Sequence, residues 1–126
     1  MNYSTTLYAT KHNYPFERWP TYFEDEKEGE KENAFVHEKC GKVQHIMDEL
    51  IESLIEMGEM APIKKKERRF EIAIKALNNL DQKAKIIENE VATDLIDLFN
   101  TISYSAGLNP DDYGDGEGIT SEWRFW

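Results

Sequence analysis

The residues best suited to metal binding are His37, Cys40 and His45, which fall within one predicted helix. Three positions separate the first pair, and five separate Cys40 from His45. At about 100° per residue, the five-residue step turns His45 away from the face that the first two share. A structural zinc ion needs four ligands, and no second group of Cys or His completes such a set. We therefore predict no metal site and interpret Cys40 as a buried thiol.

The C-terminal tail contains part of a calcium-binding pattern. Positions 1, 5, 6 and 12 of an EF-hand loop are matched by Asp111, Asp115, Gly116 and Glu122. Position 3, which needs an oxygen ligand, holds Tyr113, and position 8, which needs an apolar residue, holds Gly118. We therefore predict a solvated acidic turn here.

Paired carboxylates could hold magnesium for phosphate chemistry. Glu49 with Glu52, and Glu56 with Glu59, have the Glu-x-x-Glu spacing that places two carboxylates on one helix face. All-α nucleoside triphosphate pyrophosphohydrolases of the MazG type use such a pair with a later Glu-x-x-Asp, which this chain lacks. A magnesium-dependent enzyme of that kind remains an alternative, but a solvated helix face explains these glutamates better.

Nucleophilic catalysis has no recognisable motif in the chain. There is no Gly-x-Ser-x-Gly and no glycine-rich phosphate loop, and the sequence around the three histidines assigns none of them a role as base. We therefore predict a protein that is not an enzyme, with no catalytic residues and no cofactor.

Apolar residues recur at helical spacing in three segments, which would form the scaffold for any site. The first runs from about Asn33, a suitable N-cap, to Met57, before Gly58. The second runs from Ile63 or Lys64 to Leu80, and the third from about Glu88 to Ala106, before Gly107. Residues 79–90 remain ambiguous between helix and connection. The stripes of the three helices comprise Val36, Cys40, Val43, Met47, Leu50, Leu54 and Met57, then Phe70, Ala73, Ile74, Leu77 and Leu80, then Val91, Leu95, Leu98, Phe99, Ile102 and Ala106.

Aromatic residues gather at both ends of the chain. Before Phe23, Pro15 and Pro20 favour an extended or irregular arm, with a short strand around Thr5 to Thr10. The last three rings, Trp123, Phe125 and Trp126, are expected to fold back on the helices. We predict an all-α fold, a compact bundle of three or more helices with aromatic N- and C-terminal arms. It forms a single domain over 1–126, with an arm at 1–32, a helical core at 33–106 and an acidic-aromatic tail at 107–126.

The charge of the chain limits the kinds of molecule that it can bind. The formal net charge is -10, which disfavours nucleic acid and anionic membranes. Residues 64–85 nevertheless carry 8 Lys or Arg against 3 Asp or Glu, so one basic segment lies between two acidic regions. No apolar run has the length of a signal peptide or a membrane span, and the single cysteine fits a reducing compartment. We expect a cytoplasmic protein.

Acidic residues stand next to aromatic residues at both ends of the chain, and interfaces commonly combine these two kinds of group. The predicted partner-binding residues are Trp19, Tyr22, Glu24, Asp25, Glu26, Asp111, Asp112, Tyr113, Asp115 and Glu117. The alternative is that the rings complete the core while the acids keep the protein in solution.

A short acidic helical chain with the segments RWPTYFEDE and GLNPDDYGDGEGITSEWRFW resembles the immunity proteins of bacterial toxin and contact-dependent growth inhibition systems. The resemblance implies a protein that binds a cognate toxin domain, commonly a basic nuclease, and blocks its active site or an adjacent surface. A phage-type acidic inhibitor of a nucleic-acid-binding protein is a further alternative.

Overall fold

The computed structural model describes residues 2–19, 29–84, 87 and 89–126 of the chain. Within these residues the fold is all-α, and no strand occurs among them. The α-helices are α1 (Tyr3–Ala9), α3 (Gly29–Met57), α4 (Ile63–Ala84) and α5 (Asn89–Ser105). The short 3-10 helices are η1 (Thr10–Asn13), η2 (Pro110–Asp112), η3 (Gly114–Gly116) and η4 (Ile119–Glu122). No helix in the described part has the length and apolar content needed to cross a membrane.

Helix α3 is the longest element, and its 29 residues extend for about 43 Å at the rise of an α-helix. It begins at Gly29, so the prediction that Asn33 caps it was wrong. Glu30, Lys31 and Glu32 are good helix formers, so the helix begins before Asn33. The predicted stop was correct, because Gly58 follows the last turn with a φ of 86°.

Helices α4 and α5 follow the prediction more closely. Helix α4 begins at Ile63 but continues four residues past Leu80, because Asp81, Gln82 and Lys83 are compatible with a helix. Helix α5 starts one residue later than expected and ends one residue earlier. Differences of this size are usual at helix ends.

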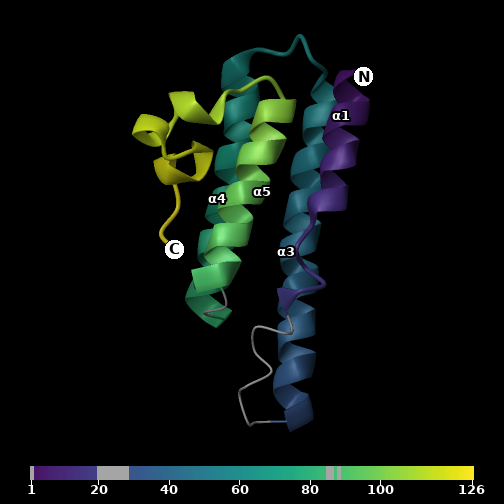
Figure 1. Cartoon of the computed structure of the whole chain (residues 1–126), viewed down its shortest axis with the longest axis vertical. Helices are drawn as coiled ribbons and strands as arrows, with labels where there is room; N and C mark the ends of the chain where they lie inside the picture. The colour runs from purple at the N-terminus through teal and green to yellow at the C-terminus, as the bar shows by residue number, and fades with distance from the viewer. Residues whose placement is uncertain (1, 20–28, 85–86, 88) are drawn as a thin grey trace.

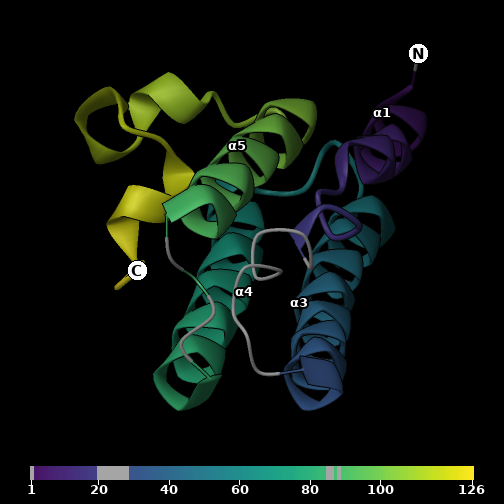
Figure 2. The same cartoon turned by 60° about the horizontal axis from the view of Figure 1, so that its bottom comes forward.

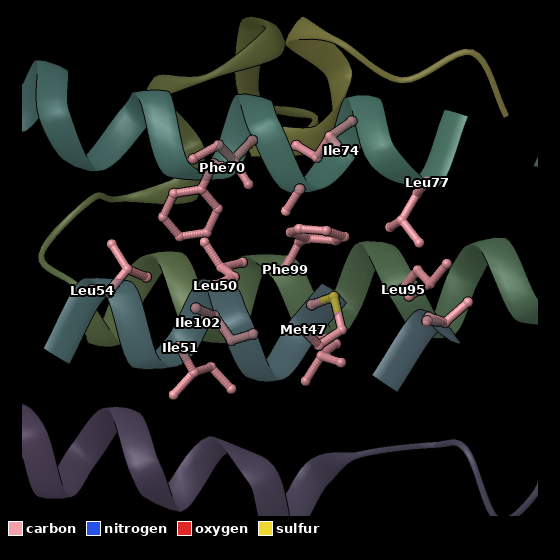
Figure 3. Close-up of a cluster of buried hydrophobic side chains, with 14 of the residues drawn as sticks. Met47, Leu50, Ile51, Leu54, Phe70, Ile74, Leu77, Leu95, Phe99 and Ile102 are labelled. Carbon is pink, nitrogen blue, oxygen red and sulfur yellow. The ribbon is translucent and has the colours of Figure 1, made fainter. Parts of the chain in front are cut away.

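The core lies where α3, α4 and α5 meet (Figure 3). Phe70 of α4 and Phe99 of α5 pack with ring centroids 6.4 Å apart. Figure 3 shows Met47 and Leu50 of α3 pointing towards these rings. The predicted stripes supply the core residues of all three helices, which include Val43, Leu54, Ile74, Leu77, Leu95 and Ile102.

Residues 3–13 are helical, so the predicted strand at Thr5 to Thr10 was wrong, and among the described residues the predicted irregular chain is limited to 14–18. Residues 20–23 of the predicted arm lie outside the described residues. Asn2 caps α1, because its Oδ1 accepts a hydrogen bond from the backbone N–H of Thr5 at 2.7 Å. Leu7 is fully buried and holds the helix against the bundle. Pro15 comes after the end of η1, so it does not interrupt either helix.

Helix α1 lies along α3 in both cartoon views (Figures 1 and 2). The C-terminal segment 107–126 packs against α5 and α4, on the opposite side of the bundle from α1 (Figures 1 and 2). The two ends of the chain therefore cover different sides of the same core.

A buried lysine joins the ends of two helices. Lys66 is only 4% exposed, and its Nζ donates hydrogen bonds to the carbonyls of Glu59 at 2.8 Å and Ala106 at 2.9 Å. The same Nζ lies 4.8 Å from the ring centroid of Tyr3. The positive charge thus sits where the C-terminal ends of α3 and α5 leave carbonyls without helical partners.

Candidate protein-binding surface

The C-terminal segment leaves α5 through a well-defined turn. Gly107 has a φ of 90°, a conformation that favours glycine. The N–H of Leu108 donates to the carbonyl of Ser103 at 2.9 Å, and the Ser103 hydroxyl donates to the Leu108 carbonyl at 2.6 Å. Both residues are buried. These contacts fix the direction in which the segment continues.

Side-chain hydrogen bonds, one from α5 and one from within the segment, hold the turns in place. Asn100 Oδ1 of α5 accepts a hydrogen bond from the N–H of Ile119 at 3.2 Å, and Ile119 is fully buried. Glu122 Oε1 accepts one from the N–H of Gly114 at 2.9 Å. A Cβ at Gly118 would lie 2.6 Å from Asn100 Oδ1, so the backbone there approaches α5 closely. The segment is therefore a fixed part of the fold.

The exposed side of this segment carries carboxylates. Four of the predicted partner-binding residues are exposed here, namely Asp111, Asp112, Asp115 and Glu117. We call these four the acidic surface. Residues 107–126 contain no lysine, and Arg124 is their one arginine. The acidic surface therefore has a strongly negative local charge.

Tyr113, also predicted to bind a partner, is half-buried among the turns. Burial, and then the neighbouring carboxylate of Glu67 on α4, raise the pKa of the Tyr113 hydroxyl to about 12. The phenol therefore stays protonated at neutral pH. Its position links the segment to α4, and the ring is less available to a partner than the sequence suggested.

The end of the chain is held by Asn78 of α4, which is 4% exposed. Its Nδ2 donates to the carbonyl of Trp123 at 2.9 Å, and its Oδ1 accepts from the N–H of Phe125 at 3.1 Å. Trp123 and Trp126 pack against the core as expected, but Phe125 is 83% exposed. Sequence reasoning missed this exposed ring, because no local pattern indicates that Asn78 anchors the backbone.

Trp19 belongs to the core, contrary to its predicted place at a binding surface. It is 1% exposed, and its ring packs edge-on against Phe16 with centroids 4.9 Å apart. Its Nε1 donates to Asp94 Oδ2 of α5 at 3.1 Å. A tryptophan in a protein core usually has its indole N–H hydrogen-bonded to an acceptor, as Trp19 does. The other predicted residues of this end, Tyr22, Glu24, Asp25 and Glu26, lie outside the described residues.

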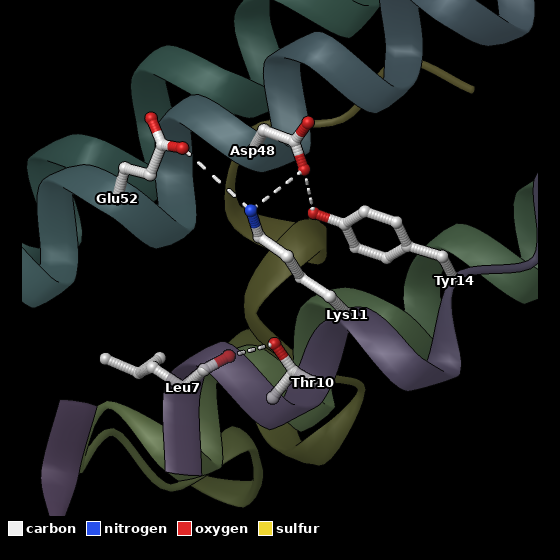
Figure 4. A network of polar contacts seen from close by, with 6 residues as sticks. All are labelled: Leu7, Thr10, Lys11, Tyr14, Asp48 and Glu52. Atoms are coloured by element: carbon white, nitrogen blue, oxygen red, sulfur yellow. Dashed lines mark hydrogen bonds and ion pairs between the residues drawn. The ribbon is translucent and has the colours of Figure 1, made fainter. Parts of the chain in front are cut away.

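A second group of polar side chains connects the N-terminal segment with α3 (Figure 4). The Tyr14 hydroxyl donates to Asp48 Oδ1 at 2.7 Å, and Lys11 Nζ lies 3.5 Å from the same oxygen. Lys11 Nζ is also 3.9 Å from Glu52 Oε1. Burial, and then the hydrogen bond to Asp48, raise the pKa of Tyr14. No local pattern in the sequence indicates this contact, because 34 positions separate Tyr14 from Asp48.

A polar pocket of about 420 Å³ adjoins this group. It is lined by Lys11, His12, Tyr14, Phe16, Glu17, Gln44 and Asp48. Its lining includes Lys11 as well as Glu17 and Asp48, so it lacks the single sign of charge that distinguishes the acidic surface.

Two of the glutamates considered for metal chemistry are paired with other side chains, and the side chain of His37 lies outside the described residues. Glu49 Oε1 is 3.0 Å from Nε2 of His45, while Glu52 is directed towards Lys11 (Figure 4). Burial raises the pKa of the Cys40 thiol. Where the structure describes side chains, no three His, Cys, Asp or Glu residues are grouped so that they could hold a metal ion.

Comparison with known proteins gives no family assignment. No family model, curated protein or solved structure matches the chain. The functional proposal is therefore based on the charge and geometry of the surface.

Proposed function

We propose that this chain is an immunity protein that binds a cognate bacterial toxin domain in the cytoplasm and neutralises it. The toxin domain is a basic nuclease, and binding covers its active site or an adjacent surface. The single observation that supports this most is the acidic surface, whose four carboxylates are exposed on turns that the bundle holds in place.

Nuclease chemistry explains why an acidic protein suits this task. A nuclease must present Lys and Arg to bind phosphates, so its substrate-binding face attracts carboxylates. The net charge of -10 adds a long-range attraction to such a face. Association would therefore be fast at low ionic strength and slower as salt is added.

The geometry also suits tight binding. The turns are held by Asn100 and Glu122 before any partner arrives, so binding would order few new residues. Phe125 offers an exposed ring at the end of the same segment, and buried aromatic anchors often dominate protein interfaces. The proposed contact thus combines a rigid acidic surface with one apolar side chain.

The first test is to purify the protein under native conditions from its own host and to identify what remains bound. The proposal expects a basic nuclease domain whose activity falls when the purified chain is added back. Recovery of a partner without nuclease activity, or of an acidic partner, would contradict it.

The second test compares two variants with equal changes of charge. One neutralises the acidic surface through Asp111→Asn, Asp112→Asn, Asp115→Asn and Glu117→Gln. The control neutralises four exposed glutamates of α3 through Glu38→Gln, Glu49→Gln, Glu52→Gln and Glu56→Gln. Association with the captured domain is measured by surface plasmon resonance. The acidic-surface variant should associate about tenfold more slowly, and the control should change less than about threefold. Equal effects would mean that only the total charge matters.

A further inference from the structure

A small apolar slot lies between α3 and α4. Its volume is about 260 Å³, and it is lined by Ile46, Glu49, Leu50, Ser53, Arg69, Ile72, Ala73 and Ala76. Ile72 is 45% exposed and therefore presents apolar surface at the slot. Among the described residues that line the slot, none belongs to α1, α5 or the C-terminal segment.

Basic side chains lie beyond the slot on both helices, towards the N-terminal end of α3 and the C-terminal end of α4. Lys39 and Lys42 precede Ile46 on α3 by seven and four residues, and Lys83 follows Ala76 on α4 by seven. Residues at such spacings lie on the same helix face. The chain runs up α3 and back down α4 (Figure 1), so these spacings place all three lysines at the same end of the two helices. Lys42 and then desolvation lower the pKa of Lys39, and Lys83 adds to this effect while Glu38 opposes it. We call Lys39, Lys42 and Lys83 the lysine cluster.

Arg69 adds positive charge at the other end of the slot. It is exposed, and it lines the slot beside Ile72. Carboxylates oppose these cations, since Glu38 Oε1 lies 3.5 Å from Nζ of Lys42, and Glu49 is engaged by His45. At the same helical spacing, Lys65 precedes Ile72 by seven residues and Glu56 follows Glu49 by seven. The slot and its ends therefore carry five basic residues against three acidic ones, although the whole chain has a net charge of -10.

We propose that this α3–α4 face binds an amphipathic helix of a partner protein, one whose apolar stripe is flanked by acidic residues. Apolar side chains of that helix enter the slot beside Ile72. Its carboxylates face Arg69 at one end and the lysine cluster at the other. This contact is separate from the acidic surface and from the basic partner proposed for it.

The dimensions of the face fit a helix. Ile46 and Ser53 are seven residues apart, so the slot spans about 11 Å along α3 and accommodates two anchor residues of a partner helix. The stretch of α3 from Lys39 to Ser53 extends for about 21 Å, which is the length of a helix of about 14 residues. Helices commonly place side chains at i and i+4 or i+7 into a groove of this kind.

The test uses two synthetic fluorescein-labelled peptides of 18 residues with the same leucine stripe. One has glutamates on both flanks of the stripe, and the other has lysines. Fluorescence anisotropy at physiological salt should show that the acidic peptide binds about tenfold more tightly. This result runs against the net charge of the chain, which by itself favours the basic peptide. Amide signals of Ile46, Ile72 and Ala76 should shift in NMR spectra when the acidic peptide is added.

Variants locate the binding. Ile72→Glu should abolish binding of the acidic peptide, and Arg69→Glu should weaken it about tenfold. Lys75→Glu is the matched control, because it reverses one exposed charge of α4 outside the slot. Circular dichroism checks that each variant folds.

Three results would overturn the proposal. The first is equal or tighter binding of the basic peptide. The second is an equal effect of Arg69→Glu and Lys75→Glu. The third is a dimer of the free chain, measured by light scattering, that Ile72→Glu dissociates, since a second copy would then occupy the slot.

Discussion

Replacing Lys66 by methionine tests how the ends of α3 and α5 are held together. Methionine keeps much of the length and packing of the side chain but cannot donate hydrogen bonds to the carbonyls of Glu59 and Ala106. A hydrogen bond to a charged group contributes about 1.5–3 kcal/mol, and Lys66 makes two of them. Burial of the ammonium opposes this gain. The net loss should be about 2–4 kcal/mol in the free energy of unfolding.

Urea unfolding followed by circular dichroism measures this loss. With a slope of about 2 kcal/mol per molar urea, the midpoint should fall by about 1–2 M. Lys65→Met is the control, because Lys65 is the exposed neighbour, and its free energy of unfolding should change by less than about 0.5 kcal/mol. If Lys66→Met were as stable as the wild type, the two hydrogen bonds from Lys66 would not stabilise the fold.

The dependence on pH gives an independent check. Burial lowers the pKa of Lys66 below its ordinary value of 10.5. Between the folded and unfolded pKa values, the unfolded chain binds more protons than the folded chain. The contribution of Lys66 to the free energy of unfolding therefore rises as pH increases through this window. The difference in stability between wild type and Lys66→Met should grow on approaching pH 10.5, and a constant difference would contradict the assignment.

Three further substitutions test other contacts by thermal or urea unfolding. Gly118→Ala should destabilise the fold by about 1–3 kcal/mol, because the new Cβ would meet Asn100 and the φ of 111° strains an alanine; an unchanged midpoint would show that the turn moves freely. Trp19→Phe should cost about 2–4 kcal/mol through the lost hydrogen bond to Asp94 and the space left in the core, whereas a surface tryptophan would tolerate the change. Tyr14→Phe should cost about 1 kcal/mol at pH 7. Because the folded pKa of Tyr14 is raised, its contribution is complete below pH 10 and declines above it, so the two proteins should converge in stability at alkaline pH.

The central helices could be predicted because their signals are local. In α5, Leu95, Phe99 and Ile102 repeat at helical spacing, and Gly107 marks the end of the helix. The buried face of each helix was predicted correctly, because one periodic stripe of apolar residues determines which side is buried. The same method failed to predict α1. A helix of seven residues has only about two turns in which a periodic pattern can show, and Leu7 is its one buried residue.

The candidate surface could be predicted only where local composition determines exposure. Asp111, Asp112, Asp115 and Glu117 are exposed as carboxylates usually are. The aromatic residues differ, because a ring is equally suited to a core and to an interface. Trp19 is buried through a contact with α5 that is 75 positions away in sequence, which no local pattern indicates.

The separation of charge has a consequence for how partners reach the protein. The acidic surface and the net charge of -10 have the same sign, so attraction of a basic partner acts over the whole molecule and strengthens steadily as salt falls. The α3–α4 face is positive within a negative chain, and its attraction for an acidic helix acts only nearby. At physiological salt the screening length is about 8 Å, comparable to the distance between packed helices, so the rest of the chain is largely screened from a helix in the slot. At low salt that screening is lost and the net charge repels the same helix. The two faces should therefore respond to ionic strength in opposite ways when salt is lowered, even though charge complementarity governs both.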